Sequence, residues 1–244
     1  MITAGVDLAA QPERTAVATI KWTVGHAVIE DLTRPADDQV ILQAVERADK
    51  TGIDCPFGWP TAFVSFVTSH HTGHVSIRAD EPSSRRKLTM RRTDLFVHKQ
   101  LGLTPLSVSA DRIAHVALRC AALLTKLEAV HGPVDRIGSG PVAEVYPAAS
   151  LRSWGLDDHG CKQTKTDALG HLVDHLLDEA PWRDCKTHEP AMRRSHDIFD
   201  AVIAAMTARA AALGQTLPPT QDDMAAARAE GWIIIPDKPI AALL

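Results

Sequence analysis

The chain of 244 residues is long enough for one large α/β domain, and 45% of its residues are hydrophobic. Its net charge of −4 excludes a protein that binds nucleic acid through overall basicity, so contact with phosphates needs a local basic segment. No stretch is apolar and long enough to cross a bilayer, and no signal peptide is recognisable, so we expect a cytoplasmic protein without a membrane partner.

Three short β segments are predicted at residues 2–7, 14–22 and 26–32. The tight turn at Val24-Gly25-His26 joins the second segment to the third. The three segments therefore predict an antiparallel meander.

Apolar residues at helical spacing predict a helix over residues 38–50, followed by a short strand at Gly52-Ile53. A strand reached through a crossover helix is expected beside the first strand, which makes a mixed sheet. Asp7 and Asp54, each at the end of its strand, should then lie at the same edge.

Residues 60–110 are rich in Pro, Ser, His and Arg, and we interpret them as an insertion with one short helix at 93–101. The segment contains the densest basic cluster of the chain, with two acids nearby: Arg78, Arg85, Arg86, Lys87, Arg91 and Arg92 against Asp80 and Glu81. A solvated loop and a phosphate-binding surface both explain it.

The second half of the chain predicts mainly helices. The segments are a helix over 110–131 capped by Ser109 or Asp111, a strand over 142–146, a helix opening at Pro147, helices over 167–177 and 197–213, a capping box at Thr220 and Asp223, and a final strand over 232–235. Together with the first half, this predicts an α/β fold of residues 1–244 in which helices flank a mixed sheet.

Four acids are the candidate metal ligands. Asp197 and Asp200 stand three apart on a predicted helix, so about 60° separates them and both share one face. Asp7 and Asp54 each end an apolar strand, where an acid needs a partner. Carboxylates concentrated in this way are the ligands that Mg²⁺ or Mn²⁺ prefers, although Ser195 or Asp197 could equally serve only as a helix cap.

Three further residues are candidates for catalysis or substrate binding. Glu144 ends the later strand and is either catalytic or paired with a nearby arginine. Arg92 and Asp94 begin the short helix of the insertion, where Arg92 could hold a phosphate or form an ion pair within the chain. The histidines at 70, 71 and 74 are more typical of a solvated loop than of a metal site.

The four cysteines, Cys55, Cys120, Cys161 and Cys185, show no short paired spacing. Neither a zinc knuckle nor a disulfide framework is predicted, and we expect free thiols.

Six short motifs occur in order along nearly the whole chain and carry a family resemblance. They are Gly5-Val6-Asp7, Gly52-Ile53-Asp54-Cys55-Pro56, Arg92-Thr93-Asp94, Glu144-Val145-Tyr146-Pro147, the segment from His196-Asp197 to Asp200-Ala201, and Glu230-Gly231-Trp232-Ile233. Together they resemble domain-of-unknown-function family 429, described as predicted nucleases with a ribonuclease H-like fold. More distantly, the acids are similar to those of Holliday-junction resolvases, in which the central-strand acid is usually a glutamate where this chain has Asp54.

The leading hypothesis is hydrolysis of a nucleic-acid phosphodiester with two metal ions about 3.5–4 Å apart. Asp7 would bridge both ions, Asp54 would hold one, and Asp197 with Asp200 the other, while Arg92 would bind a phosphate of DNA or RNA.

Two alternatives remain. An actin-like or sugar-kinase-like phosphotransferase would need a glycine-rich phosphate loop, which the segment Leu8-Ala9-Ala10-Gln11-Pro12 does not provide. A non-catalytic module that binds nucleic acid or protein would have its acids neutralised by arginines.

Overall fold

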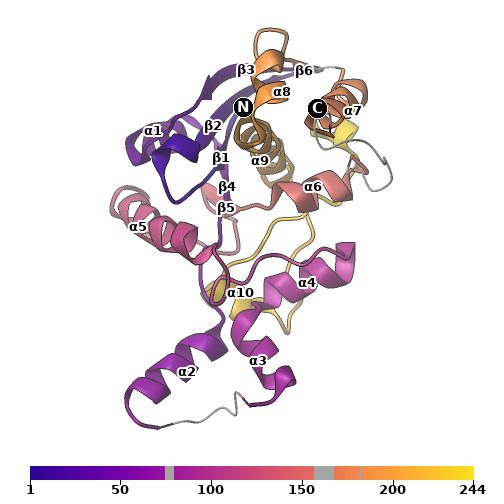
Figure 1. The fold of residues 1–244 in the computed structure, drawn as a ribbon. Helices are drawn as coiled ribbons and strands as arrows, with labels where there is room; N and C mark the ends of the chain where they lie inside the picture. The colour runs from indigo at the N-terminus through magenta and orange to yellow at the C-terminus, as the bar shows by residue number, and fades with distance from the viewer. Residues whose placement is uncertain (75–79, 157–167, 182) are drawn as a thin grey trace.

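The computed structural model describes residues 1–74, 80–156, 168–181 and 183–244. In it, helices cover both faces of one six-stranded mixed sheet (Figure 1). Arg78, Cys161 and Asp167, which the sequence interpretation used, lie outside the described residues.

The sheet has the strand order β5-β4-β1-β2-β3-β6. The strands are β1 (Ile2–Asp7), β2 (Ala16–Thr23), β3 (His26–Thr33), β4 (Lys50–Asp54), β5 (Val142–Glu144) and β6 (Arg183–Asp184). Strands β1, β2 and β3 are antiparallel neighbours, whereas β4 is parallel to β1, β5 to β4 and β6 to β3. The predicted meander and the place of β4 beside β1 are confirmed, and the topology is consistent with a ribonuclease H-like fold.

The register between β1 and β4 aligns the two motifs that end these strands. Asp7 is the partner of Asp54, and Gly5 is the partner of Gly52. The two acids therefore lie side by side at one edge of the sheet, as predicted.

Strand β2 shows how the two faces of the sheet are covered. Val17 packs with helices α1 (Asp38–Arg47) and α5 (Ala114–His131) on one face. Ala18 and Ile20 point the other way and pack with α7 (Ala168–Glu179), α8 (Glu189–Arg194) and α9 (His196–Ala212). Alternation along one strand thus places the core on both sides of the sheet.

Helix α9 lies directly on the backbone of β1 and β4. A Cβ atom at Gly5 would lie 2.0 Å from the Ala201 carbonyl oxygen, and one at Gly52 would lie 2.5 Å from the Ala204 carbonyl oxygen. These distances are far below van der Waals contact, so only glycine permits this packing.

The insertion contains three helices rather than one: α2 (Thr61–His71), α3 (Pro82–Thr89) and α4 (Arg92–Leu101). Figure 1 shows α2 and α3 extending away from the sheet. The predicted short helix is α4, whereas α2 was not anticipated. Its segment is rich in β-branched and aromatic residues and buries none of them, so it carries neither high helix propensity nor an amphipathic pattern.

The remaining elements are α6 (Pro147–Ser153), α10 (Met224–Glu230) and two 3₁₀ turns, η1 (Pro12–Arg14) and η2 (Ile240–Leu243). The predicted final strand at residues 232–235 is wrong in extent. Its backbone forms only an isolated bridge between Ile234 and Val145, and a second bridge joins Thr216 to Pro236. None of the described helices combines the length and apolar character needed to cross a membrane.

The expectation of free thiols is wrong for two cysteines, because Cys55 and Cys120 form a disulfide. Cys55 follows β4, and Cys120 lies on the face of α5 that packs against the sheet. A separation of 65 residues hides this pairing in the sequence, since only the fold brings the two together. Cys185 is free and buried.

Candidate acidic site at the end of the sheet

Three elements bring acids to one place. Asp7 is the last residue of β1, Asp54 is the last residue of β4, and Asp200 lies near the start of α9. The Ser195 hydroxyl accepts a hydrogen bond from the Ile198 amide at 3.3 Å. Ser195 is therefore the N-cap of α9, one of the two caps that the sequence allowed. The cap and the contacts at Gly5 and Gly52 together place the helix-borne acid near the strand-borne pair.

Burial and mutual repulsion disfavour charge on these carboxyl groups. Burial, followed by the charges of Asp200 and Asp197, raises the pKa of Asp7 to about 8. Burial and the charge of Asp197 raise the pKa of Asp200 to about 7. The pKa of Asp54 is raised well above its ordinary value by burial and then by Asp7 and Asp200.

Asp197 differs from these three acids because arginines neutralise it. Its carboxylate accepts a hydrogen bond from Arg34 Nε at 2.9 Å and lies 3.9 Å from a guanidinium nitrogen of Arg14. Among the described residues, no hydrogen bond or ion pair reaches the side chains of Asp7, Asp54 or Asp200. The structure thus separates an arginine-paired acid from three acids without a cationic partner.

The oxygen donors of these three acids suit a hard divalent cation. Within the ranges that the structure describes, no group of three or more His, Cys, Asp or Glu side chains is arranged as a metal-binding cluster. The acids are close enough to shift one another's pKa values, but they are not drawn together into one coordination sphere. Their suitability for Mg²⁺ or Mn²⁺ therefore rests on two observations. Their carboxylate oxygens are the ligands that these ions prefer, and no cationic side chain pairs with them among the described residues.

Glu144, the third strand-end acid, lies in a buried ion pair. Arg91 donates to both of its carboxylate oxygens, at 2.7 and 3.0 Å, and the Phe57 amide donates to it at 2.9 Å. Of the two interpretations of Glu144, catalysis or pairing with an arginine, the structure contains the arginine pair. An ion pair buried in this way is costly to break, because the remaining partner stays charged and unpaired.

The two residues expected to bind substrate have other contacts. Asp94 is fully buried and accepts hydrogen bonds from the Arg91 amide at 2.8 Å and the Arg91 guanidinium at 2.9 Å. Arg92 forms an ion pair with Asp223, while its side chain remains 53% exposed. The ion pair within the chain, left open for Arg92, is therefore present.

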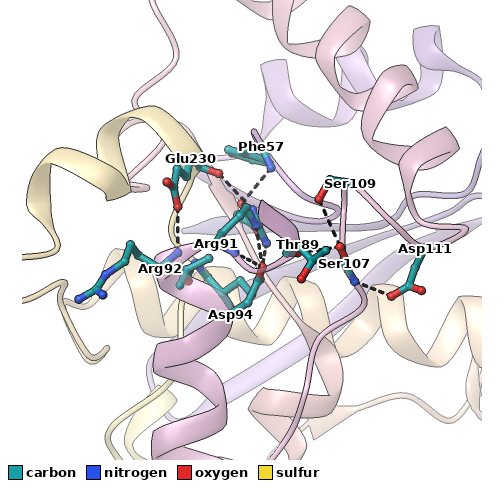
Figure 2. A network of polar contacts seen from close by, with 12 residues as sticks. Phe57, Thr89, Arg91, Arg92, Asp94, Ser107, Ser109, Asp111 and Glu230 are labelled. Atoms are coloured by element: carbon teal, nitrogen blue, oxygen red, sulfur yellow. Dashed lines mark hydrogen bonds and ion pairs between the residues drawn. The ribbon is translucent and has the colours of Figure 1, made fainter. Parts of the chain in front are cut away.

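A single carboxylate holds the insertion against the C-terminal segment. Glu230 accepts a hydrogen bond from the Thr61 amide at 2.9 Å and another from the Arg92 amide at 2.8 Å, so it caps the first turns of α2 and α4 (Figure 2 shows the contact with Arg92). The Glu230 carbonyl also accepts a hydrogen bond from Arg91 at 3.2 Å. One network thus connects α2, α4, α10 and the end of β5.

A cavity of about 230 Å³ adjoins Asp54. It is lined by Asp54, Cys55, Pro56, Arg91, Pro105, Leu106, Ile113, Glu144, Val145, Tyr146 and Ile233. Sequence reasoning named Arg91 only as part of the basic cluster and did not single out Tyr146, which stands in one of the motifs that it used. The signal for Tyr146 was its place after β5, where a side chain faces the same sheet edge as Asp54.

Other polar residues of the insertion lie on the surface. Arg85, Arg86 and Lys87 are exposed on α3, and Arg85 donates to the Asp80 carbonyl at 2.9 Å. Arg91, which the sequence grouped with them, is buried, so the basic surface is smaller than predicted. His70, His71 and His74 are exposed at the end of α2.

Comparison with other proteins identifies the family. No curated protein and no solved structure shows significant similarity to this chain. The family described as "Protein of unknown function (DUF429)" matches residues 5–224, a span that contains the end of β1 and all of β4, β5 and α9 with their acids. The chain belongs to the DUF429 family.

Proposed function

We propose that this protein is a metal-dependent nuclease that hydrolyses phosphodiester bonds. The observation that carries the proposal is the contrast between two sets of acids at one sheet edge. Asp197 and Glu144 are paired with arginines, whereas Asp7, Asp54 and Asp200 are partly buried without a cationic partner among the described residues. A non-catalytic module would have every acid neutralised, so the three unpaired carboxyl groups favour a site for cations.

The residues divide into two roles in this proposal. Asp7, Asp54 and Asp200 would hold Mg²⁺ or Mn²⁺, and a bound ion would supply an activated water and charge stabilisation at the phosphate. Asp197 holds Arg34 beside the acids, and Arg14 lies next to them with a side chain that is 73% exposed. We expect Arg14 to contact a substrate phosphate, because an exposed guanidinium binds phosphate well.

The test combines thermal unfolding with cleavage assays. Mn²⁺ should raise the melting temperature of the wild type, because a ligand that binds only the native state stabilises it. At a Mn²⁺ concentration about one hundred times the Kd, the free energy of unfolding should rise by about 2.7 kcal/mol. Asp7→Asn should lose both this shift and metal-dependent cleavage of DNA or RNA. Asp222→Asn is the matched control, since Asp222 is an exposed acid in the turn before α10.

The proposal fails under either of two results. One is that no DNA or RNA substrate, single-stranded, double-stranded or branched, is cleaved with Mg²⁺ or Mn²⁺. The other is cleavage that Asp7→Asn leaves unchanged.

A further inference from the structure

One wall of the cavity beside Asp54 is apolar and has no role in the proposed binding of metal ions. Pro105, Leu106 and Ile113 come from the segment between α4 and α5, and they line the cavity together with Tyr146, which follows β5, and Ile233. Leu106 lines this cavity and is 46% exposed. An apolar cavity with a few polar groups is the usual form of a binding site for a small ring.

Side-chain hydrogen bonds fix this wall in place. Ser107 Oγ donates to the Thr89 carbonyl at 2.6 Å, and the Ser107 amide donates to Asp111 at 2.8 Å (Figure 2). Ser109 Oγ donates to the Leu88 carbonyl at 2.7 Å. The segment that carries Leu106 is thus tied to the end of α3. Because the wall is held before any ligand arrives, binding would cost little ordering of the loop.

The floor of the cavity is equally fixed. Arg91 and Glu144 satisfy each other there and are supported by Asp94 and the Phe57 amide. The Tyr146 hydroxyl, in contrast, has no hydrogen-bond partner within the described part of the chain. Together with the Asp54 carboxyl group, it is therefore a polar group of the cavity that remains available to a ligand.

The volume limits what can enter. With roughly 30 Å³ for each water, about 230 Å³ holds about eight waters, which is close to the heavy-atom count of one nucleobase. A base that is stacked and paired in a duplex cannot reach such a cavity. Extrusion costs a few kcal/mol for a paired base and least for a base that is already unpaired.

We propose that this cavity receives one unstacked nucleobase from a nucleotide next to the phosphate bound at the acids. The preferred substrate is then a nucleic acid with an unpaired nucleotide at the cleavage position. The apolar side chains contact the faces of the base, and the Tyr146 hydroxyl bonds to its edge. This inference rests on the proposed function for the identity of the neighbouring phosphate.

Binding measurements without metal test the cavity independently of cleavage. Fluorescence anisotropy in EDTA compares three labelled probes, each made as DNA and as RNA: a perfect duplex, the same duplex with one bulged nucleotide, and the duplex with an abasic bulge. We expect the bulged duplex to bind about tenfold more tightly than the other two, as for a single base contact. Leu106→Ala and Tyr146→Phe should each reduce this preference severalfold.

Two controls separate the cavity from general effects on the fold. Leu118→Ala removes another exposed leucine, on α5 outside the cavity, and should leave all three affinities unchanged. Tyr146 is the single tyrosine of the chain, so fluorotyrosine gives one ¹⁹F resonance. That resonance should shift with the bulged probe and not with the abasic one.

The proposal is overturned if the three probes bind equally or do not bind, or if Leu106→Ala behaves like Leu118→Ala. These outcomes are distinct from failure of the proposed function. Base-dependent binding without cleavage would retain the cavity and refute the nuclease. Metal-dependent cleavage that is lost in Asp7→Asn, without any preference for the bulged probe, would support the nuclease and refute the base-binding cavity.

Discussion

Asp7 has unfavourable surroundings for a carboxylate in the acidic site. It is enclosed at the end of a central strand, and two helix-borne acids repel its charge, while Arg14 and Arg34 only partly offset them. A residue with these costs destabilises the protein unless a ligand compensates for it. Replacing Asp7 alone therefore tests whether this carboxyl group destabilises the metal-free protein.

Removing the charge of Asp7 should stabilise the metal-free protein at alkaline pH. The ordinary pKa of 3.8 applies to the unfolded chain, and the native pKa is about 8, so between these values the native state holds a proton that the unfolded state has released. The stabilisation from this group is complete below pH 3.8 and is lost as the pH rises through 8. Asp7→Asn, which resembles the protonated form, should flatten this decline.

The measurement is denaturant unfolding in EDTA at pH 5 and pH 8. At pH 8 we expect Asp7→Asn to be more stable than the wild type by at least about 1 kcal/mol, since one pKa unit corresponds to about 1.4 kcal/mol. At pH 5 only about one pH unit of the decline has occurred, so Asp7→Asn should exceed the wild type by a smaller margin than at pH 8. Equal stability of both proteins at pH 8 would contradict the raised pKa.

At the scale of elements, the site depends on how closely α9 approaches the sheet. The acids of β1 and β4 precede those of α9 by most of the chain, and Gly5 and Gly52 permit the contact that unites them. A helix held further from the sheet would move Asp200 away from Asp7. The two glycines thus determine the geometry of the acidic site without taking part in its chemistry.

Gly5→Ala should therefore affect both stability and ion binding. Its methyl group would meet backbone atoms of Ala201 and Ala205, which cannot move without shifting the helix. We expect a loss of about 3 kcal/mol or more in the free energy of unfolding, at the upper end for overpacking, together with a loss of the Mn²⁺-induced shift. Gly140→Ala is the matched control, because its Cβ would meet only the Asp135 side chain, at 3.8 Å.

Element boundaries also show what the sequence could predict. Strands β1 to β4 and helix α9 follow from periodicity and caps, and their order implies the register that aligns Asp7 with Asp54. The pairing of Glu144 with Arg91 could not be predicted, because the two come from elements far apart in sequence and only the fold decides which arginine reaches the acid. The contacts of Glu230 with α2 and α4 could not be predicted for the same reason, because they join residues far apart in the sequence.

At the scale of the whole molecule, the disulfide connects the end of the strand that carries Asp54 to the helix layer opposite α9. Cys55 directly follows Asp54, and Cys120 belongs to the helix covering the opposite face of the sheet from α9. A cross-link that encloses 65 residues restricts the unfolded chain strongly. It therefore contributes to stability, and its Cys55 also lines the cavity beside Asp54.

Reduction should lower the free energy of unfolding by about 2–4 kcal/mol. The comparison is between wild-type protein with and without a phosphine reductant, and the double variant Cys55→Ser, Cys120→Ser should not respond to the reductant. Before reduction, the denatured wild type should react with two fewer equivalents of thiol reagent than afterwards. Identical unfolding curves with and without reductant would refute this contribution.

The contact between α9 and the first strands also determines when the acids can meet. Chains are synthesised from the N-terminus, and pairing between distant segments forms late and slowly. A growing chain carries Asp7 and Asp54 long before the helix with Asp200 has been made. The acidic site is therefore absent from every incomplete chain that ends before α9, and we expect any cation-dependent activity to begin only once synthesis has passed α9.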